Sequence, residues 1–102
     1  MTQDVTVSRI VDLLESRGFA QVAGYNRFGF VERGTSHVVI SRENGKDTRI
    51  PFAKIEQAVL AVRRDPKVYS EGPSRLRTHG ITHITSPLWA LLHLLTLNDL
   101  SH

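Results

Sequence analysis

Cationic side chains concentrate in the middle third of this 102-residue sequence. Residues 42 to 77 hold nine Lys or Arg against five Asp or Glu, whereas residues 1 to 41 hold four of each. A protein that binds nucleic acid needs cations that follow the phosphates, because counterion release supplies much of the affinity. The charge placement therefore predicts nucleic acid as a partner. The predicted contact residues are led by Arg75, Arg77 and His79 and supported by Arg49, Lys46, Arg42 and Lys67.

An alternative interpretation of the same segment is a solvated surface of mixed charge. The formal net charge of the chain is only +3. Acidic residues are also interspersed among the cations, namely Glu43, Asp47, Glu56, Asp65 and Glu71. The charge pattern alone leaves both interpretations open.

Histidine spacing raises the question of a metal site. His79 and His83 are four residues apart, as in helices that grip a metal ion. Gly80 and β-branched Ile81 disfavour a helix there, and no third ligand lies at a recognisable spacing. We therefore predict no metal and no other cofactor, and we expect these histidines to form local hydrogen bonds or to face solvent.

Catalytic motifs give no positive signal. The sequence contains no nucleophile elbow, phosphate-binding glycine loop or zinc-protease helix, so we predict no catalytic residues. A catalytic set dispersed along the chain would escape this search, which leaves a small enzyme as a third hypothesis.

Aromatic residues alternate with polar or small ones in the segment 25–30, which reads Tyr-Asn-Arg-Phe-Gly-Phe. Exposed aromatic rings on a sheet can stack on bases. Because the chain has only seven aromatic residues, we expect Phe28 and Phe30 to be needed in the core instead.

A second hypothesis concerns an apolar helix near the end of the chain, predicted from Leu88 to Leu97. Its leucines form one stripe and Trp89 widens it. If the helix is not fully covered, Trp89, Leu94 and Leu97 would form an interface with a protein partner or a second copy of the chain. Burial within the same molecule is the alternative.

Periodicity predicts the elements that position these residues. An amphipathic helix over 7–17 ends at Gly18. Strands are expected from Phe19, over 27–33, over 36–42 and over 47–52, the last two joined by a two-residue turn centred on Asn44-Gly45. A helix is expected over 53–64. It ends at Asp65-Pro66, because proline disfavours helical geometry in the residue before it.

The remainder is predicted to be a long basic loop and a final helix. Residues 67–85 lack a sustained period, although 81–85 alternate like a short strand. Ser86 is expected to cap the last helix, with Pro87 in its first turn.

Composition fits one globular α+β domain over residues 1–102, with an N-terminal helix, an antiparallel sheet of three to four strands and two later helices. The chain is 40% hydrophobic and has no cysteine, so apolar burial must stabilise it. No secretory signal is expected, and the longest apolar stretch is about half the roughly 20 residues that span a bilayer. We expect a cytoplasmic protein without a membrane partner.

These observations favour a small nucleic-acid-binding module that uses a basic hairpin and loop, with DNA preferred over RNA. The alternative is a protein-interaction or homodimerisation module that uses the apolar helix.

Overall fold

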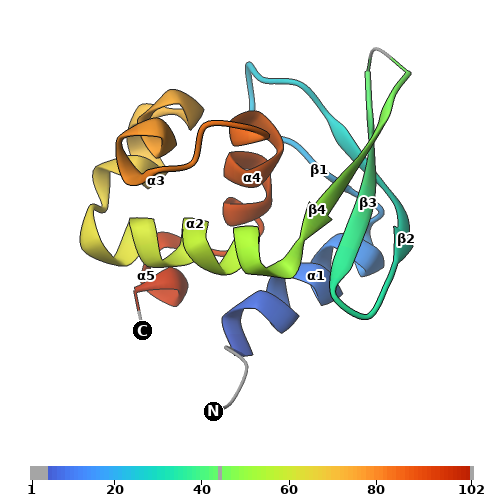
Figure 1. Ribbon diagram of the computed structural model, residues 1–102, viewed down its shortest axis with the longest axis horizontal. Helices are drawn as coiled ribbons and strands as arrows, with labels where there is room; N and C mark the ends of the chain where they lie inside the picture. Colours follow the sequence, from blue (N-terminus) through green and yellow to red (C-terminus); the bar gives the residue numbers. More distant parts are fainter. Residues whose placement is uncertain (1–4, 44, 102) are drawn as a thin grey trace.

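A four-stranded antiparallel sheet lies beside a layer of helices in the computed structural model, which describes residues 5–43 and 45–101 (Figure 1). The strands follow one another in space as they do in sequence. They are β1 Phe19–Ala20, β2 Phe28–Arg33, β3 His37–Arg42 and β4 Asp47–Pro51.

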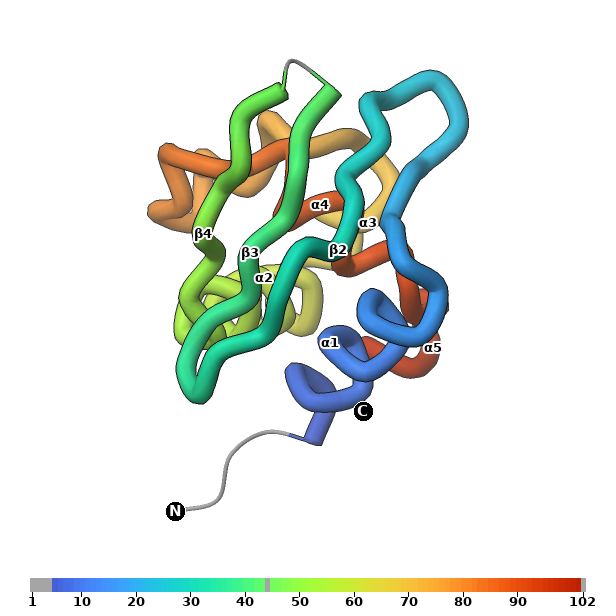
Figure 2. Tube along the Cα trace, turned by 90° about the vertical axis from the view of Figure 1, so that its right-hand side faces the viewer, coloured from blue at the N-terminus to red at the C-terminus, as the bar shows by residue number. Residues whose placement is uncertain are grey.

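Helices precede and follow the sheet, so the predicted α+β class is confirmed. They are α1 Val5–Arg17, α2 Phe52–Arg64, α3 Lys67–Glu71, the 3-10 helix η1 Pro73–His79, α4 Thr85–Leu92 and α5 Leu97–Leu100. Viewed from the sheet side, α2 and α4 lie behind the strands (Figure 2). Across the described part of the chain, no helix is both long and apolar enough to cross a bilayer.

The core lies between one face of the sheet and the helices. Val38, Ile40 and Ile50 alternate with more exposed residues along β3 and β4, and all three are fully buried. They meet the apolar stripe of α2, where Ile55 and Val59 are also fully buried. Apolar residues recur every second position in the strands and about every 3.6 positions in α2. These two periods are the reason why the strands and α2 could be predicted.

The β3–β4 hairpin forms, but its turn differs from the expected one. The backbone N–H of Arg42 donates to the carbonyl of Lys46, so the turn is one residue longer than a two-residue turn. Gly45 lies inside it with a φ of 88°, as three-residue hairpin loops require at this position. Asn44 lies outside the described residues.

The predicted loop over 67–85 is wrong in part, because α3 and η1 occupy most of it. These helices span five and seven residues, which is too short for an apolar period to emerge. The expected strand over 81–85 is not seen either. Instead, Ile84 adopts a φ of 53° and turns the chain into α4.

The last helix starts and stops earlier than expected. Ser86 is not its cap, because α4 begins at Thr85 and Ile84 is the capping residue. The helix ends at Leu92, and a turn leads to α5, where the Thr96 hydroxyl accepts a hydrogen bond from the Asp99 N–H. Pro87 lies in the first turn, as predicted.

Candidate functional site

Two of the three leading predicted contact residues are held by acidic partners. The Asp65 carboxylate accepts hydrogen bonds from Arg75 Nε at 2.8 Å and from His79 Nε2 at 3.1 Å. A second nitrogen of Arg75 lies 3.1 Å from a Glu71 carboxylate oxygen. This cluster links the end of α2 to η1 and neutralises the charge of Arg75 locally.

Hydrogen bonding in this cluster favours the charged forms of Asp65 and Arg75. The bonds from His79 and then from Arg75 lower the pKa of Asp65. The bond to Asp65 in turn raises the pKa of Arg75. Groups that stabilise each other in this way are typical of a structural ion pair, and they are less available to a phosphate.

Three further predicted contact residues lie apart from one another. Lys67 begins α3, whereas Lys46 lies at the tip of the β3–β4 hairpin, and Figure 1 places these two elements on opposite sides of the molecule. Arg49 is exposed on the face of the sheet that points away from the helices. One of its nitrogens lies 3.5 Å from His37 Nδ1. The structure does not bring these three cations to one surface.

Arg42 and Arg77, by contrast, line the same recess, although they are far apart in the sequence. We call this hollow of about 210 Å³ the basic recess. Its lining residues are Arg42, Arg77, Thr82, His83, Ile84, Thr85, Ser86 and Pro87.

The alternation of β3 explains why Arg42 reaches this recess. Arg42 continues the row of Val38 and Ile40 on the helix-facing side, just beyond the end of the buried core. Its Nε donates to the Thr48 hydroxyl across the hairpin at 2.7 Å. The hydrogen bond fixes the side chain and leaves the terminal nitrogens of the guanidinium for another acceptor.

Arg77 adds a second cation to the lining, and His83 adds an imidazole. Arg77 is exposed in the last turn of η1, and His83 is exposed between η1 and α4. Among residues 5–43 and 45–101, no carboxylate forms an ion pair with Arg42 or Arg77. The basic recess therefore holds two guanidinium groups whose charge is not neutralised by a salt bridge.

The N-terminus of α4 faces the same recess. No side chain in the described part of the chain caps this helix. Thr85 and Ser86, the first two residues of α4, line the recess. Their backbone N–H groups and the helix dipole add positive potential to that of the two arginines.

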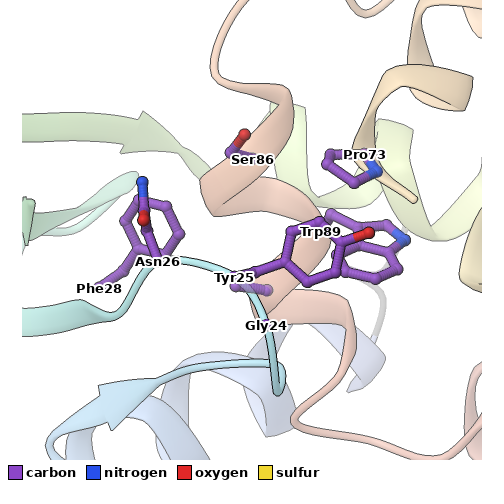
Figure 3. A pocket seen from close by; sticks show the side chains of 8 residues that line it. Gly24, Tyr25, Asn26, Phe28, Pro73, Ser86 and Trp89 are labelled. Atoms are coloured by element: carbon purple, nitrogen blue, oxygen red, sulfur yellow. The ribbon is translucent and has the colours of Figure 1, made fainter.

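A second hollow, of about 140 Å³, lies beside the N-terminal part of α4 (Figure 3). We call it the aromatic recess. Its lining residues are Gly24, Tyr25, Asn26, Phe28, Pro73, Ser86, Trp89 and Ala90. Ser86 lines both recesses.

Aromatic rings form the walls of the second recess. The Tyr25 ring meets Trp89 edge to face, with 4.8 Å between the ring centres. Trp89 is only 4% exposed and Phe28 only 2%, but Tyr25 is 46% exposed. The expectation that Phe28 belongs to the core is confirmed, and Phe30 packs partly buried against it. Tyr25 is the aromatic residue of the 25–30 segment that remains accessible.

The proposed partner face on the last helix is largely covered in this structure. Trp89 is buried and its indole N–H donates to the Val68 carbonyl at 2.7 Å. Leu94 and Leu97 are partly buried and pack against the core. Within the described ranges, the large apolar side chains that remain exposed are Val5, Tyr25, Val31 and Leu60. None of them belongs to α4.

His93 packs and hydrogen-bonds inside the protein. Its Nε2 donates to the Tyr69 carbonyl at 2.8 Å, and its ring stacks on the Tyr69 ring at 3.8 Å. Burial lowers the pKa of His93, and the hydrogen bond to the carbonyl opposes that shift. The histidine is therefore held in its neutral form inside an aromatic stack.

Comparison with protein-family models, curated proteins and solved structures finds no match to this chain. The sequence marks His83 only as a candidate metal ligand and Ser86 only as a helix cap, and it assigns Trp89 to a partner face. A usable signal was present, because the Thr85-Ser86-Pro87 helix start follows a basic segment closely.

Proposed function

We propose that this chain binds nucleic acid, DNA in preference to RNA, by holding backbone phosphate in the basic recess. The observation that carries the proposal is the convergence of Arg42 and Arg77 on one hollow without a carboxylate partner among the described residues. A guanidinium group offers paired N–H donors that match phosphate oxygens. Two such groups with the His83 imidazole nearby suit a single phosphate.

The lining of the recess supports an anionic ligand over an apolar one. Thr82, Thr85 and Ser86 add hydroxyl groups that can donate to phosphate oxygens. The uncapped start of α4 favours negative charge at the same place. An apolar ligand would leave all of these donors without acceptors.

The proposed contact surface differs from the one predicted from the sequence, which was led by Arg75, Arg77 and His79. Arg75 and His79 are held by Asp65, so we assign them to the structure of the domain. Arg49 and Lys67 do not line the recess. Lys67 stays a predicted contact for the parts of a longer strand that extend beyond the recess, whereas Arg49 leaves the proposed contact surface because it lies on the far face of the sheet.

An affinity measurement across salt concentrations tests the proposal. Fluorescein-labelled single-stranded DNA, RNA of the same sequence and duplex DNA are titrated with the protein, and anisotropy is recorded. A phosphate-driven complex weakens steeply as salt rises. We expect Arg77→Ala to reduce the slope of log affinity against log salt by about 1.

The matched control is Arg49→Ala. It removes the same charge from an exposed side chain on the far face of the sheet. We expect it to leave the affinity for a short oligonucleotide nearly unchanged. Equal losses in the two variants would show that net charge drives binding without a defined site, and no binding by the unmodified protein would refute the proposal.

A further inference from the structure

We propose that the two recesses around Ser86 hold one nucleotide unit, with its base against Tyr25 in the aromatic recess and its phosphate between Arg42 and Arg77 in the basic recess. This inference rests on the proposed function and names the form of nucleic acid that is recognised. The ligand is a nucleotide whose base is not stacked in a duplex.

Two observations show that the recesses adjoin. Ser86 lines both of them. In addition, the guanidinium carbon of Arg42 in the basic recess lies 5.8 Å from the ring centre of Phe28 in the aromatic recess. A ligand with one part in each recess would therefore pass beside Ser86.

The sizes of the recesses suit two parts of one ligand. Pockets that enclose a whole drug-sized ligand measure roughly 300 to 1,000 Å³. The aromatic recess has about 140 Å³ and the basic recess about 210 Å³. Each alone is too small for such a ligand, but together they reach the lower end of that range.

The chemistry of the aromatic recess suits a planar base. Trp89, Phe28 and Pro73 supply apolar walls, and Tyr25, which is 46% exposed, supplies a ring on which a base can stack. The Asn26 side chain lies at the end of the recess away from Trp89 (Figure 3). Its amide offers both a donor and an acceptor to the edge of a base.

The loop that carries Tyr25 and Asn26 is held in place before any ligand binds. The Tyr25 N–H donates to the Val22 carbonyl at 2.9 Å, in a turn that Gly24 permits with a φ of 88°. The Glu43 carboxylate accepts a hydrogen bond from the Arg27 N–H at 2.6 Å and ties the loop to the end of β3. Such preorganisation reduces the entropy lost on binding.

A base in this recess cannot remain stacked between its neighbours. Proteins that bind an isolated base act on single strands or flip the base out of the duplex at a cost of a few kcal/mol. We therefore expect single-stranded DNA to bind more tightly than duplex DNA of the same sequence. A free nucleotide has the same chemistry as a nucleotide within a strand, so the experiment separates these two sources.

Trp89 is the only tryptophan of the sequence, and it lines the recess that would receive the base. Its fluorescence therefore reports on occupancy directly. The probes are deoxyadenosine 5′-monophosphate, deoxyadenosine without phosphate, deoxyribose 5-phosphate without base, and a single-stranded oligodeoxyadenosine. We expect the monophosphate and the oligonucleotide to change Trp89 fluorescence at the lowest concentrations, and each fragment to bind at least about 10-fold more weakly.

Variants at Tyr25 separate stacking from a structural role. Tyr25→Ala should weaken binding of the monophosphate about 10-fold, whereas Tyr25→Phe keeps the ring and should stay within about 2-fold of the unmodified protein. Leu60→Ala removes an exposed apolar side chain from α2 and serves as the control. Equal losses in Tyr25→Ala and Leu60→Ala would overturn the inference.

The outcomes distinguish this inference from the proposed function. If oligonucleotides bind but neither Trp89 fluorescence nor Tyr25→Ala responds, phosphate binding stands and the nucleotide site is refuted. If the monophosphate binds with the expected dependence on Tyr25 while no oligonucleotide binds, the nucleotide site stands for a free ligand and the nucleic-acid function is refuted. If neither probe binds, both the nucleic-acid function and the nucleotide site are refuted.

Discussion

The guanidinium carbon of Arg42 lies 5.8 Å from the centre of the Phe28 ring, across the antiparallel pair of β2 and β3. The two residues are direct register partners. Because Phe28 lines the aromatic recess and Arg42 the basic recess, the register of this strand pair joins the two halves of the candidate site. A slip by one residue would turn Arg42 to the opposite face of the sheet.

Trp89→Ala should destabilise the protein strongly. The side chain is 4% exposed and its indole N–H bonds to the Val68 carbonyl. Its removal leaves a cavity and an unpaired carbonyl, so we expect a loss of about 3 to 5 kcal/mol in the free energy of unfolding. Urea denaturation followed by circular dichroism measures it. A change below about 1 kcal/mol would mean that the ring is not part of the core.

Arg75→Ala and Arg77→Ala should have opposite profiles. Arg75 is bonded to Asp65 and Glu71, so its loss should lower the melting temperature and leave oligonucleotide affinity nearly unchanged. Arg77 has no such partner in the described part of the chain, so its loss should weaken binding and leave the melting temperature nearly unchanged. Thermal melting and anisotropy on both variants decide the assignment, which the reverse pattern would contradict.

Acidification should remove a stabilising contribution of His93. Burial lowers the pKa of His93 in the folded state, whereas an unfolded histidine titrates near 6.5. Below about pH 6.5 the unfolded chain therefore takes up a proton that the folded chain does not, and stability falls. NMR titration of the imidazole should give a pKa below 6.5, and a value at or above it would refute the burial argument.

Asp65 should contribute to stability in a lower pH range. Its hydrogen bonds with His79 and Arg75 lower its pKa in the folded state. The contribution is therefore complete above the unfolded value near 3.9 and disappears as the pH falls through the folded value. We expect Asp65→Asn to melt below the unmodified protein at pH 6, with the gap narrowing toward pH 2. A gap that stays constant with pH would contradict this role.

Local patterns in the sequence predicted most of the fold. The spacing of Val7, Ile10 and Leu14 marks α1, and the alternation through Val38 and Ile40 marks β3. These signals are reliable because each element has one buried face. Short helices such as α3 and η1 carry too few residues for a period, so their segment was predicted to be a loop.

The candidate site depended on long-range contacts that a sequence pattern does not contain. Nothing local indicates that Asp65 pairs with Arg75 and His79. Nor does it indicate that Arg42 lines the same recess as Arg77, which lies 35 positions later in the chain. The positive φ of Ile84 was also unpredictable, because a β-branched residue rarely adopts it. Charge counting therefore found the basic segment but could not tell structural cations from available ones.

An NMR titration of the ¹⁵N-labelled protein with a short single-stranded DNA locates the bound phosphate directly. If phosphate is held between Arg42 and Arg77, the backbone amides that shift most will be those of Arg77, His83, Thr85 and Ser86. The amide of Arg49, on the far face of the sheet, will move little. Shifts that are largest at Arg49, or spread evenly over exposed cations, would show that Arg42 and Arg77 do not form a phosphate site.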